Sequence, residues 1–270
     1  MYKIEPKRSK MFDHTKRNFE LSMMHQGMSI FSRIRQAGGA LVDALLPPVC
    51  LLCGASGGHW PVCPGCRADL PTLPSSACPV CLEATTHGER CGACLMRPPH
   101  FERLVALYPY AFPVDRLVLA FKYQAQFALA RWWATELAGR LTSEPAFTAV
   151  DAIMPVPLHS ERLSERGYDQ AHVLARHLAH ALKLPLAADG LIKCRATPQQ
   201  SALDLKSRRK NLRNAFTLTG EVEGKRILLV DDVLTTGATL DEAARTLKQR
   251  GAAEVWAVTV ARTLKGVRRQ

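Results

Sequence analysis

The chain has 270 residues, of which 47% are hydrophobic and 22% charged, which is typical of a globular protein with one sizeable domain and a smaller module. No apolar run reaches the ~18–20 residues that cross a bilayer, and no signal-peptide pattern follows the N-terminus, so we expect a cytoplasmic location. The formal net charge of +12 suggests affinity for phosphates, on a small ligand or along a nucleic acid.

The N-terminal segment, residues 1–28, is polar, basic and without periodicity. We interpret it as a disordered tail, or as sequence upstream of the true start, with Met28 as an alternative start. Helical spacing begins directly after Met28 and ends at two prolines, Pro47 and Pro48. Apolar residues that could form one face of this helix are Ile30, Phe31, Ile34, Leu41, Val42 and Leu45.

Eight of the nine cysteines lie between residues 50 and 94, in four Cys-x-x-Cys pairs. The pairs form an internal repeat, because Cys78 follows Cys50 by 28 residues, as Cys94 follows Cys66. Each Cys-x-x-Cys turn can direct two thiolates at one ion, so the eight sulfurs predict about two structural zinc sites with no open position for catalysis. The predicted zinc ligands are Cys50, Cys53, Cys63, Cys66, Cys78, Cys81, Cys91 and Cys94.

Alternatives to zinc are an iron–sulfur cluster or disulfides, and the spacing leaves open whether the sites are sequential or interleaved. His59 and His87 are additional candidate ligands, but four sulfurs already complete each copy, so we interpret both as loop residues. The predicted N-terminal helix and the cysteine segment together form a proposed module over residues 29–97.

The remaining residues, 98–270, alternate between strand and helix patterns, which predicts an α/β domain with a mostly parallel sheet and flanking helices. Trp132 and Trp133 stand at helical spacing, which favours core packing over base stacking. The expected elements are strands over 104–110, 151–157, 192–194 and 254–260, helices around 129–141 and over 170–184, an apolar stretch over 117–123 and a polar loop over 158–170.

A polar, basic segment covers residues 196–214. Its length and weak periodicity predict either a lid over a ligand or a basic docking surface. Cys194, just before it, has no recognisable partner motif, and we expect it to be a buried structural thiol.

The most informative stretch covers residues 225–239. An apolar run over 227–230 predicts a buried parallel strand, and Asp231 and Asp232 follow at its carboxyl end, where open α/β sheets bind ligands. Next come Thr235, Thr236, Gly237, Ala238 and Thr239, and then a helical pattern. Small residues, hydroxyls and a helix start suit a phosphate, and the adjacent carboxylates suit sugar hydroxyls.

These features together resemble the ComF family, in which a double zinc ribbon precedes a type I phosphoribosyltransferase domain. The resemblance covers residues from about 45 to the end. Asp169 departs from it, because the family more often has Asn there, and residues 124–126 replace a stretch that frequently contains Gly. Beyond the cysteines, the matching motifs are Phe121-Lys122-Tyr123, residues 155–158, Arg162-x-x-x-Arg166 through Gln170, Thr197-x-x-Gln200 with Arg209 and Asn211, and residues 230–239.

The resemblance implies a role for each matching residue. Asp231 and Asp232 would bind the ribose hydroxyls, and residues 235–239 would hold the 5′-phosphate of phosphoribosyl pyrophosphate or a related nucleotide. Lys122 and Tyr123 would face the pyrophosphate, which would carry Mg²⁺. Arg162 and Arg166 would contact the pyrophosphate or an anionic acceptor, and residues 197–213 would close over the site.

Three functions remain open at this stage. The first is a phosphoribosyltransferase whose acceptor is unknown. The second is a competence factor that binds single-stranded DNA or partner proteins of the competence machinery, as the family's association with DNA uptake implies. The third is a metal-stapled interaction module, which the intact acid pair and threonines argue against.

Overall fold

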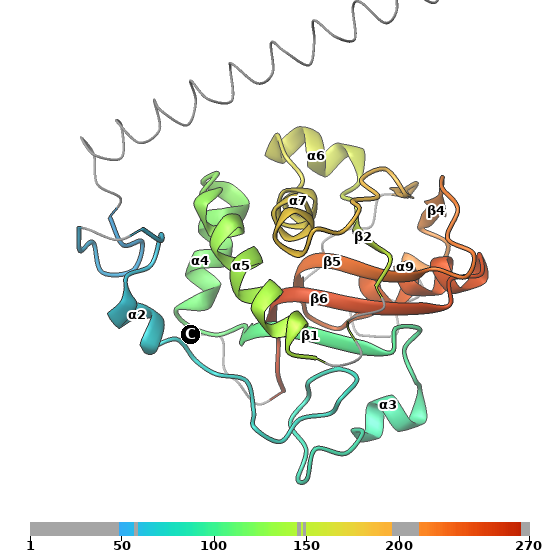
Figure 1. Ribbon diagram of the computed structural model, residues 1–270, viewed down its shortest axis with the longest axis horizontal. Coiled ribbons are helices and arrows are strands. Elements are labelled where there is room, and N and C mark those ends of the chain that lie inside the picture. The colour runs from blue at the N-terminus through green and yellow to red at the C-terminus, as the bar shows by residue number, and fades with distance from the viewer. Residues whose placement is uncertain (1–48, 57–58, 145–146, 148–149, 196–210, 266–270) are drawn as a thin grey trace, which may run out of the picture.

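A computed structural model describes residues 49–56, 59–144, 147, 150–195 and 211–265 (Figure 1). The predicted tail over 1–28, the helix after Met28 and most of the basic segment over 196–214 lie outside these residues. None of the helices in the described ranges is long and apolar enough to cross a membrane.

The centre of the molecule is a four-stranded parallel sheet with the order β1-β6-β5-β2. Most residues of its two central strands are buried, because helices and other elements cover both faces of the sheet. A separate antiparallel pair, β3 and β4, lies beside it. The strands are β1 (Arg103–Pro109), β2 (Ala152–Pro155), β3 (Leu191–Lys193), β4 (Phe216–Leu218), β5 (Arg226–Leu234) and β6 (Glu254–Arg262).

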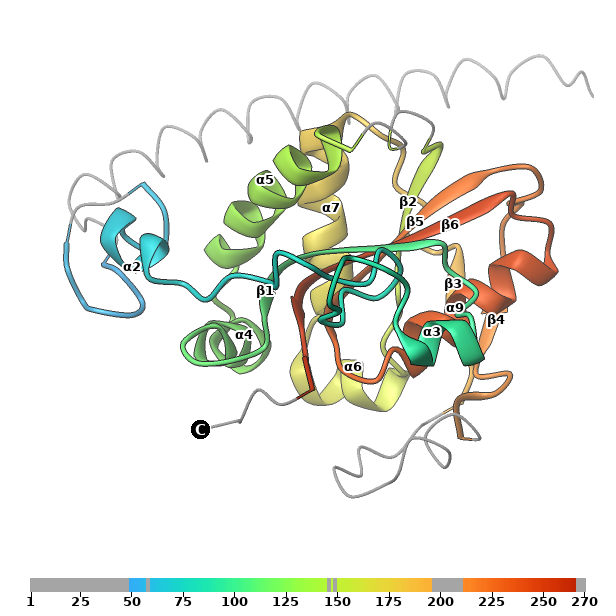
Figure 2. The same ribbon diagram turned by 90° about the horizontal axis from the view of Figure 1, so that it is seen from below.

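The helices divide between the two faces of the sheet (Figure 2). Each face has its own hydrophobic cluster. Helices α4, α5 and α7 pack on one face, where Trp132 and Trp133 are fully buried, which confirms core packing. Helix α9 and the β3–β4 pair cover the other face. The helices are α2 (Pro64–Ala68), α3 (Gly92–Met96), α4 (Val114–Tyr123), α5 (Ala128–Thr142), α6 (Ser160–Arg166), α7 (Gln170–Leu182) and α9 (Ala238–Gln249).

The two cysteine repeats lie at separate places on the domain, with α2 beside α5 and α3 near α9 (Figures 1 and 2). Cys50 of the first repeat joins the cluster on the α5 face, whereas Cys78 and Cys94 of the second join the cluster on the α9 face. Consecutive copies of one sequence motif therefore have different structural neighbours.

Three expectations are corrected by the structure. The segment 158–170 is not only a loop, because it contains α6, which ends at Gly167 in the left-handed conformation (φ 76°). Strand β5 does not stop before the acids but runs through them to Leu234. Cys194 is exposed and not buried, and its thiol contacts the Thr217 hydroxyl at 3.1 Å.

Candidate functional site

The acid pair, Asp231 and Asp232, lies within β5, so the backbone ladder fixes the direction of both side chains. Side chains alternate between the faces of a strand. Asp232 therefore lies on the same side as Val230, toward α4, α5 and α7. Asp231 lies on the same side as Leu229, toward α9 and the β3–β4 pair. The pair thus presents one carboxylate to each layer of the domain.

Asp232 is held by Lys122, from the last turn of α4. The Lys122 Nζ lies 2.9 Å from Asp232 Oδ1, and the two side chains are only 20% and 11% exposed. Burial lowers the pKa of Lys122, but the charges of Asp232 and Asp231 outweigh this effect and leave that pKa raised. Lys122 is therefore positively charged at neutral pH, directly beside the acid pair.

Among the residues that the structure describes, Asp231 forms no such ion pair, and it is harder to ionise than an ordinary aspartate. Burial raises its pKa, as does the charge of Asp232, while Lys122 and a backbone hydrogen bond oppose them. The backbone bond is the one that Asp232 N–H donates to Asp231 Oδ1 at 2.8 Å. Together these influences raise the pKa of Asp231 to about 7. A partner that supplies hydroxyl donors or positive charge would favour its ionised form.

The threonine loop (residues 235–239) follows β5 and begins α9. Gly237 is the N-cap of α9 and has φ 77°, the left-handed region that favours glycine. Because glycine has no side chain, the N-cap residue itself accepts no side-chain hydrogen bond from the first backbone N–H groups of the helix. The Thr236 hydroxyl accepts a hydrogen bond from Ala238 N–H at 3.4 Å. These features give the loop the properties of an anion site at a helix N-terminus.

Around Lys122, residues from α6 and α7 form a second group. The Arg166 guanidinium lies 5.2 Å from the centroid of the Tyr123 ring, and it donates to the Tyr123 hydroxyl at 3.4 Å and to Gln170 Oε1 at 2.9 Å. Gln170 is buried and donates to the Lys122 carbonyl at 3.5 Å. The structure therefore brings Lys122, Tyr123 and Arg166 together at the end of α4.

Lys193, the last residue of β3, is a candidate site residue that the sequence did not reveal. Burial lowers its pKa, and the charge of Arg162 lowers it further, while Asp231 and Asp169 raise it. These interactions put its ammonium group in the electrostatic reach of Asp231, from the opposite side to Lys122. No local motif marks Lys193, and only the pairing of β3 with β4 would have indicated it.

Asp169, where the resemblance leads one to expect Asn, has a structural function. Its two carboxylate oxygens accept from the backbone N–H groups of His172, at 3.0 Å, and of Leu158, at 2.8 Å. One side chain thus caps α7 and anchors the end of the segment after β2.

The eight cysteines form two sequential groups of four, and the sulfurs in each group all lie within 4.8 Å of one another. Four sulfurs at ~2.3 Å from a tetrahedral zinc ion are about 3.8 Å apart. The Sγ atoms of Cys53 and Cys63 are 3.7 Å apart, and those of Cys81 and Cys91 are 3.6 Å apart. These distances fit two zinc sites and are too long for disulfides. We call them the first site (Cys50, Cys53, Cys63, Cys66) and the second site (Cys78, Cys81, Cys91, Cys94).

Two protein families match the chain. The double zinc ribbon domain matches residues 41–95, and the phosphoribosyl transferase domain matches residues 169–270. DNA utilization protein YhgH of Escherichia coli O157:H7 is 34% identical over 225 residues, which are 81% of this chain and 99% of the relative. Competence protein F of Haemophilus influenzae is 34% identical over 201 residues, 72% of this chain and 87% of the relative. The chain belongs to the ComF family.

Among solved structures, the purine phosphoribosyltransferase of Pyrococcus horikoshii Ot3 aligns with this ComF protein at a TM-score of 0.31 and 22% identity, covering 49% of this chain and 84% of that one. The family assignment and the parallel sheet confirm the predicted two-part architecture, and the cysteine groups settle the pairing as sequential. The roles of the individual residues in this ComF protein, and the boundaries of its domains, stay predictions.

Proposed function

We propose that this ComF protein binds phosphoribosyl pyrophosphate with Mg²⁺ in the cytoplasm and transfers the phosphoribosyl group to an acceptor, in support of natural competence and DNA uptake. One observation carries the proposal. The acid pair near the end of a central parallel strand is followed directly by the threonine loop and a helix N-terminus, and it faces a mostly buried lysine, Lys122. This combination suits a ribose that bears a phosphate better than it suits a bare phosphate.

The ribose phosphate would lie along the end of β5. The carboxylates of Asp231 and Asp232 would accept hydrogen bonds from the ribose hydroxyls. The threonine loop, which comprises Thr235, Thr236, Gly237, Ala238 and Thr239, would hold the 5′-phosphate with backbone N–H groups and hydroxyls.

The pyrophosphate would lie toward the end of α4. Lys122 and Tyr123 would face it, and Arg166 would add a second cation within the same group. Arg162 would contact the pyrophosphate or an anionic acceptor. Mg²⁺ bound by pyrophosphate and ribose oxygens would neutralise charge on the leaving group.

In the transfer, the bond between ribose C1 and the pyrophosphate oxygen breaks, and its electron pair leaves with the pyrophosphate. A lone pair of the acceptor forms the new bond to C1. The sugar is electron-deficient at the transition state, so the carboxylates of the acid pair stabilise it while the basic side chains stabilise the departing anion.

Titration calorimetry with phosphoribosyl pyrophosphate and Mg²⁺ tests the binding. The native protein should bind, and the double variant Asp231→Ala/Asp232→Ala should bind at least tenfold more weakly, because it loses charge-assisted hydrogen bonds worth ~1.5–3 kcal/mol each. Equal binding by both proteins, or none by the native one, would refute the proposal. A screen for pyrophosphate release against bases and amines would then identify an acceptor.

A second candidate function is single-stranded DNA binding. The observation that favours it is two exposed aromatic side chains, Tyr123 and Phe127, which are 60% and 44% exposed. The Tyr123 ring lies beside the basic residue Arg166. Exposed aromatic rings beside cations can stack bases. Binding that weakens steeply as salt increases would support this function, and an affinity independent of salt would contradict it.

A further inference from the structure

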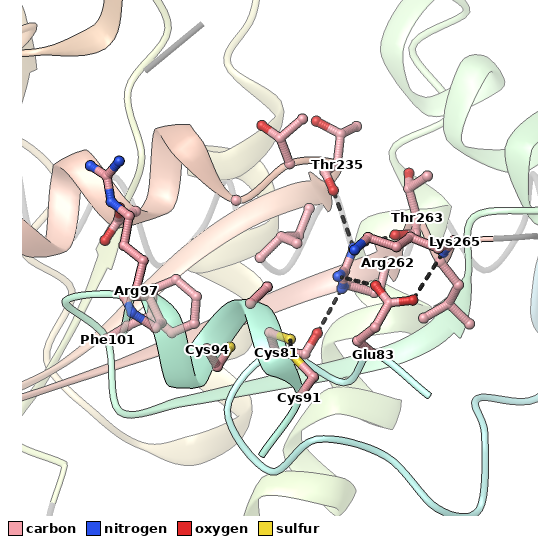
Figure 3. Close-up of a pocket in the computed structure, with 17 residues that line it drawn as sticks. Cys81, Glu83, Cys91, Cys94, Arg97, Phe101, Thr235, Arg262, Thr263 and Lys265 are labelled. Carbon is pink, nitrogen blue, oxygen red and sulfur yellow. Dashed lines mark hydrogen bonds and ion pairs between the residues drawn. The ribbon is translucent and has the colours of Figure 1, made fainter. Parts of the chain in front are cut away.

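Arg262, the last residue of β6, connects the second cysteine site to the threonine loop (Figure 3). Its side chain is 9% exposed and forms an ion pair with the Glu83 carboxylate at 3.0 Å. Its Nε donates to the Cys81 carbonyl at 2.6 Å, and one terminal nitrogen donates to the Thr235 carbonyl at 3.1 Å and also to the Thr263 carbonyl. One rigid guanidinium group therefore joins a zinc-ligand residue to the first residue of the threonine loop.

A second contact joins the same two regions. His100, which follows the second cysteine site, donates to Asp241 Oδ1 from its backbone N–H and from Nδ1, each at 2.8 Å. Asp241 lies in the first turn of α9, directly after the threonine loop. A cavity of about 400 Å³ lies beside these contacts, and its lining includes Arg262 and Asp241, Cys94 of the second site and Thr235 of the loop (Figure 3).

The first cysteine site is anchored elsewhere. Arg67, next to Cys66, donates to Glu136 of α5 at 2.5 Å and lies 5.6 Å from the Trp132 ring centroid. Its neighbours therefore belong to the α5 face, away from the threonine loop. The two sites have the same cysteine spacing, so they provide a matched comparison within one chain.

We propose that Arg262 is a positioning residue through which the second cysteine site sets the conformation of the threonine loop. The inference rests on the proposed function in so far as this loop holds a phosphate. A planar guanidinium imposes the directions of its hydrogen bonds, so a fixed Cys81 carbonyl fixes Thr235 as well. Zinc at the second site would hold Cys81, whereas within the described ranges the contacts beside the first site lead to α5 and not to the threonine loop.

Arg262→Met tests the connection, because it keeps the length of the side chain and removes every donor. We expect the bound zinc to stay at about two ions per chain. Hydrogen exchange across the threonine loop should accelerate at least tenfold. Affinity for phosphoribosyl pyrophosphate should fall about tenfold, which is the loss expected from removing one charged hydrogen bond. Glu83→Gln keeps the size of the buried partner and removes its charge, so it should give a smaller effect in the same direction. If Arg262→Met fails to fold, Glu83→Gln decides the outcome.

The metal comparison uses Cys81→Ser and Cys53→Ser, which occupy equivalent positions in the two repeats. Each should release about one zinc ion. Only Cys81→Ser should accelerate exchange in the threonine loop. Equal acceleration by both, or native exchange in a folded Arg262→Met or Glu83→Gln protein, overturns the proposal. Exchange needs no ligand, so failure of the native protein to bind phosphoribosyl pyrophosphate would refute the proposed function and leave this test intact.

Discussion

Replacing Asp231 by Asn should stabilise the protein without ligand while weakening its binding of phosphoribosyl pyrophosphate. The pKa of this carboxyl rises from its ordinary value near 3.8 to about 7, with burial as the main cause and the charge of Asp232 as the second. A pKa that is higher in the folded state means that the ionised carboxylate destabilises the fold. This loss of stability is absent below pH ~4, grows as the pH rises, and is complete above the pKa that Asp231 has in the folded protein.

The magnitude follows from the shift. Three pKa units at about 1.4 kcal/mol each set a ceiling of about 4 kcal/mol, and solvent around the half-buried carboxylate reduces this to about 2 kcal/mol. Asn keeps the shape of the side chain and the oxygen that accepts from Asp232 N–H at 2.8 Å. Asp231→Asn should therefore raise the free energy of unfolding by about 2 kcal/mol at pH 8 and by about half of that at pH 5.5.

Urea unfolding between pH 5.5 and 8.5, without added Mg²⁺, measures this difference and avoids the acid range in which thiolates release zinc. Asp69→Asn, which makes the same substitution at an exposed position outside the site, serves as the control. An Asp231→Asn protein that is no more stable than the native one at pH 8, or whose gain does not change with pH, would refute the reasoning.

Three further outcomes follow from individual contacts. Asp232→Asn should destabilise the unliganded protein by about 2 kcal/mol in the same urea assay, because Lys122 loses a mostly buried partner, and a gain like that of the Asp231 variant would contradict this. Metal analysis should find about two zinc ions per chain, and one fewer in Cys53→Ser or Cys81→Ser; fewer than one in native protein would argue against zinc. Lys183→Gly should raise stability by about 1 kcal/mol in thermal melts, because exposed Lys183 ends α7 at φ 56°, while Lys183→Ala should show no such gain.

The sequence predicted the central elements well where side-chain pattern and backbone structure coincide. The apolar runs of β1, β5 and β6 are long because both faces of the sheet are covered. The pattern failed at the end of β5, where Asp231 interrupts the apolar run although the backbone ladder continues to Leu234, opposite Arg262. Periodicity reports where apolar side chains lie, and it does not detect a strand that continues through functional polar residues.

Helix α6 was missed for a related reason. None of its residues is buried, and its only large apolar side chain, Leu163, is 42% exposed, so it has no apolar stripe to detect. The departure from Gly in residues 124–126 is a different case. Ala125 has φ 51°, a conformation that glycine adopts without strain, so the backbone keeps the shape that the family's glycine would favour.

The cysteine spacing predicted the ligand sets but could not predict their surroundings. Equivalent bridges, Val49 with Ser56 and Ala77 with Ala84, show that both repeats fold alike locally. Local similarity carries no information about the face of the sheet on which each repeat packs. Lys193 and Arg262 were missed for the same reason, since each reaches the site only through tertiary structure.

The end of β5 combines features that oppose each other. Lys122 forms a close ion pair with Asp232, and the raised pKa of Asp231 shows that the unliganded fold resists the second negative charge that ligand binding would require. A loop next to such a pair needs support that does not come from the acids themselves. Arg262 supplies it from the opposite side, with hydrogen bonds to Thr235 and to a metal-ligand residue, Cys81. If zinc holds Cys81, these hydrogen bonds fix the threonine loop whether or not the acid pair is protonated. Evolution can then select the acid pair for ligand binding, even where it lowers the stability of the fold.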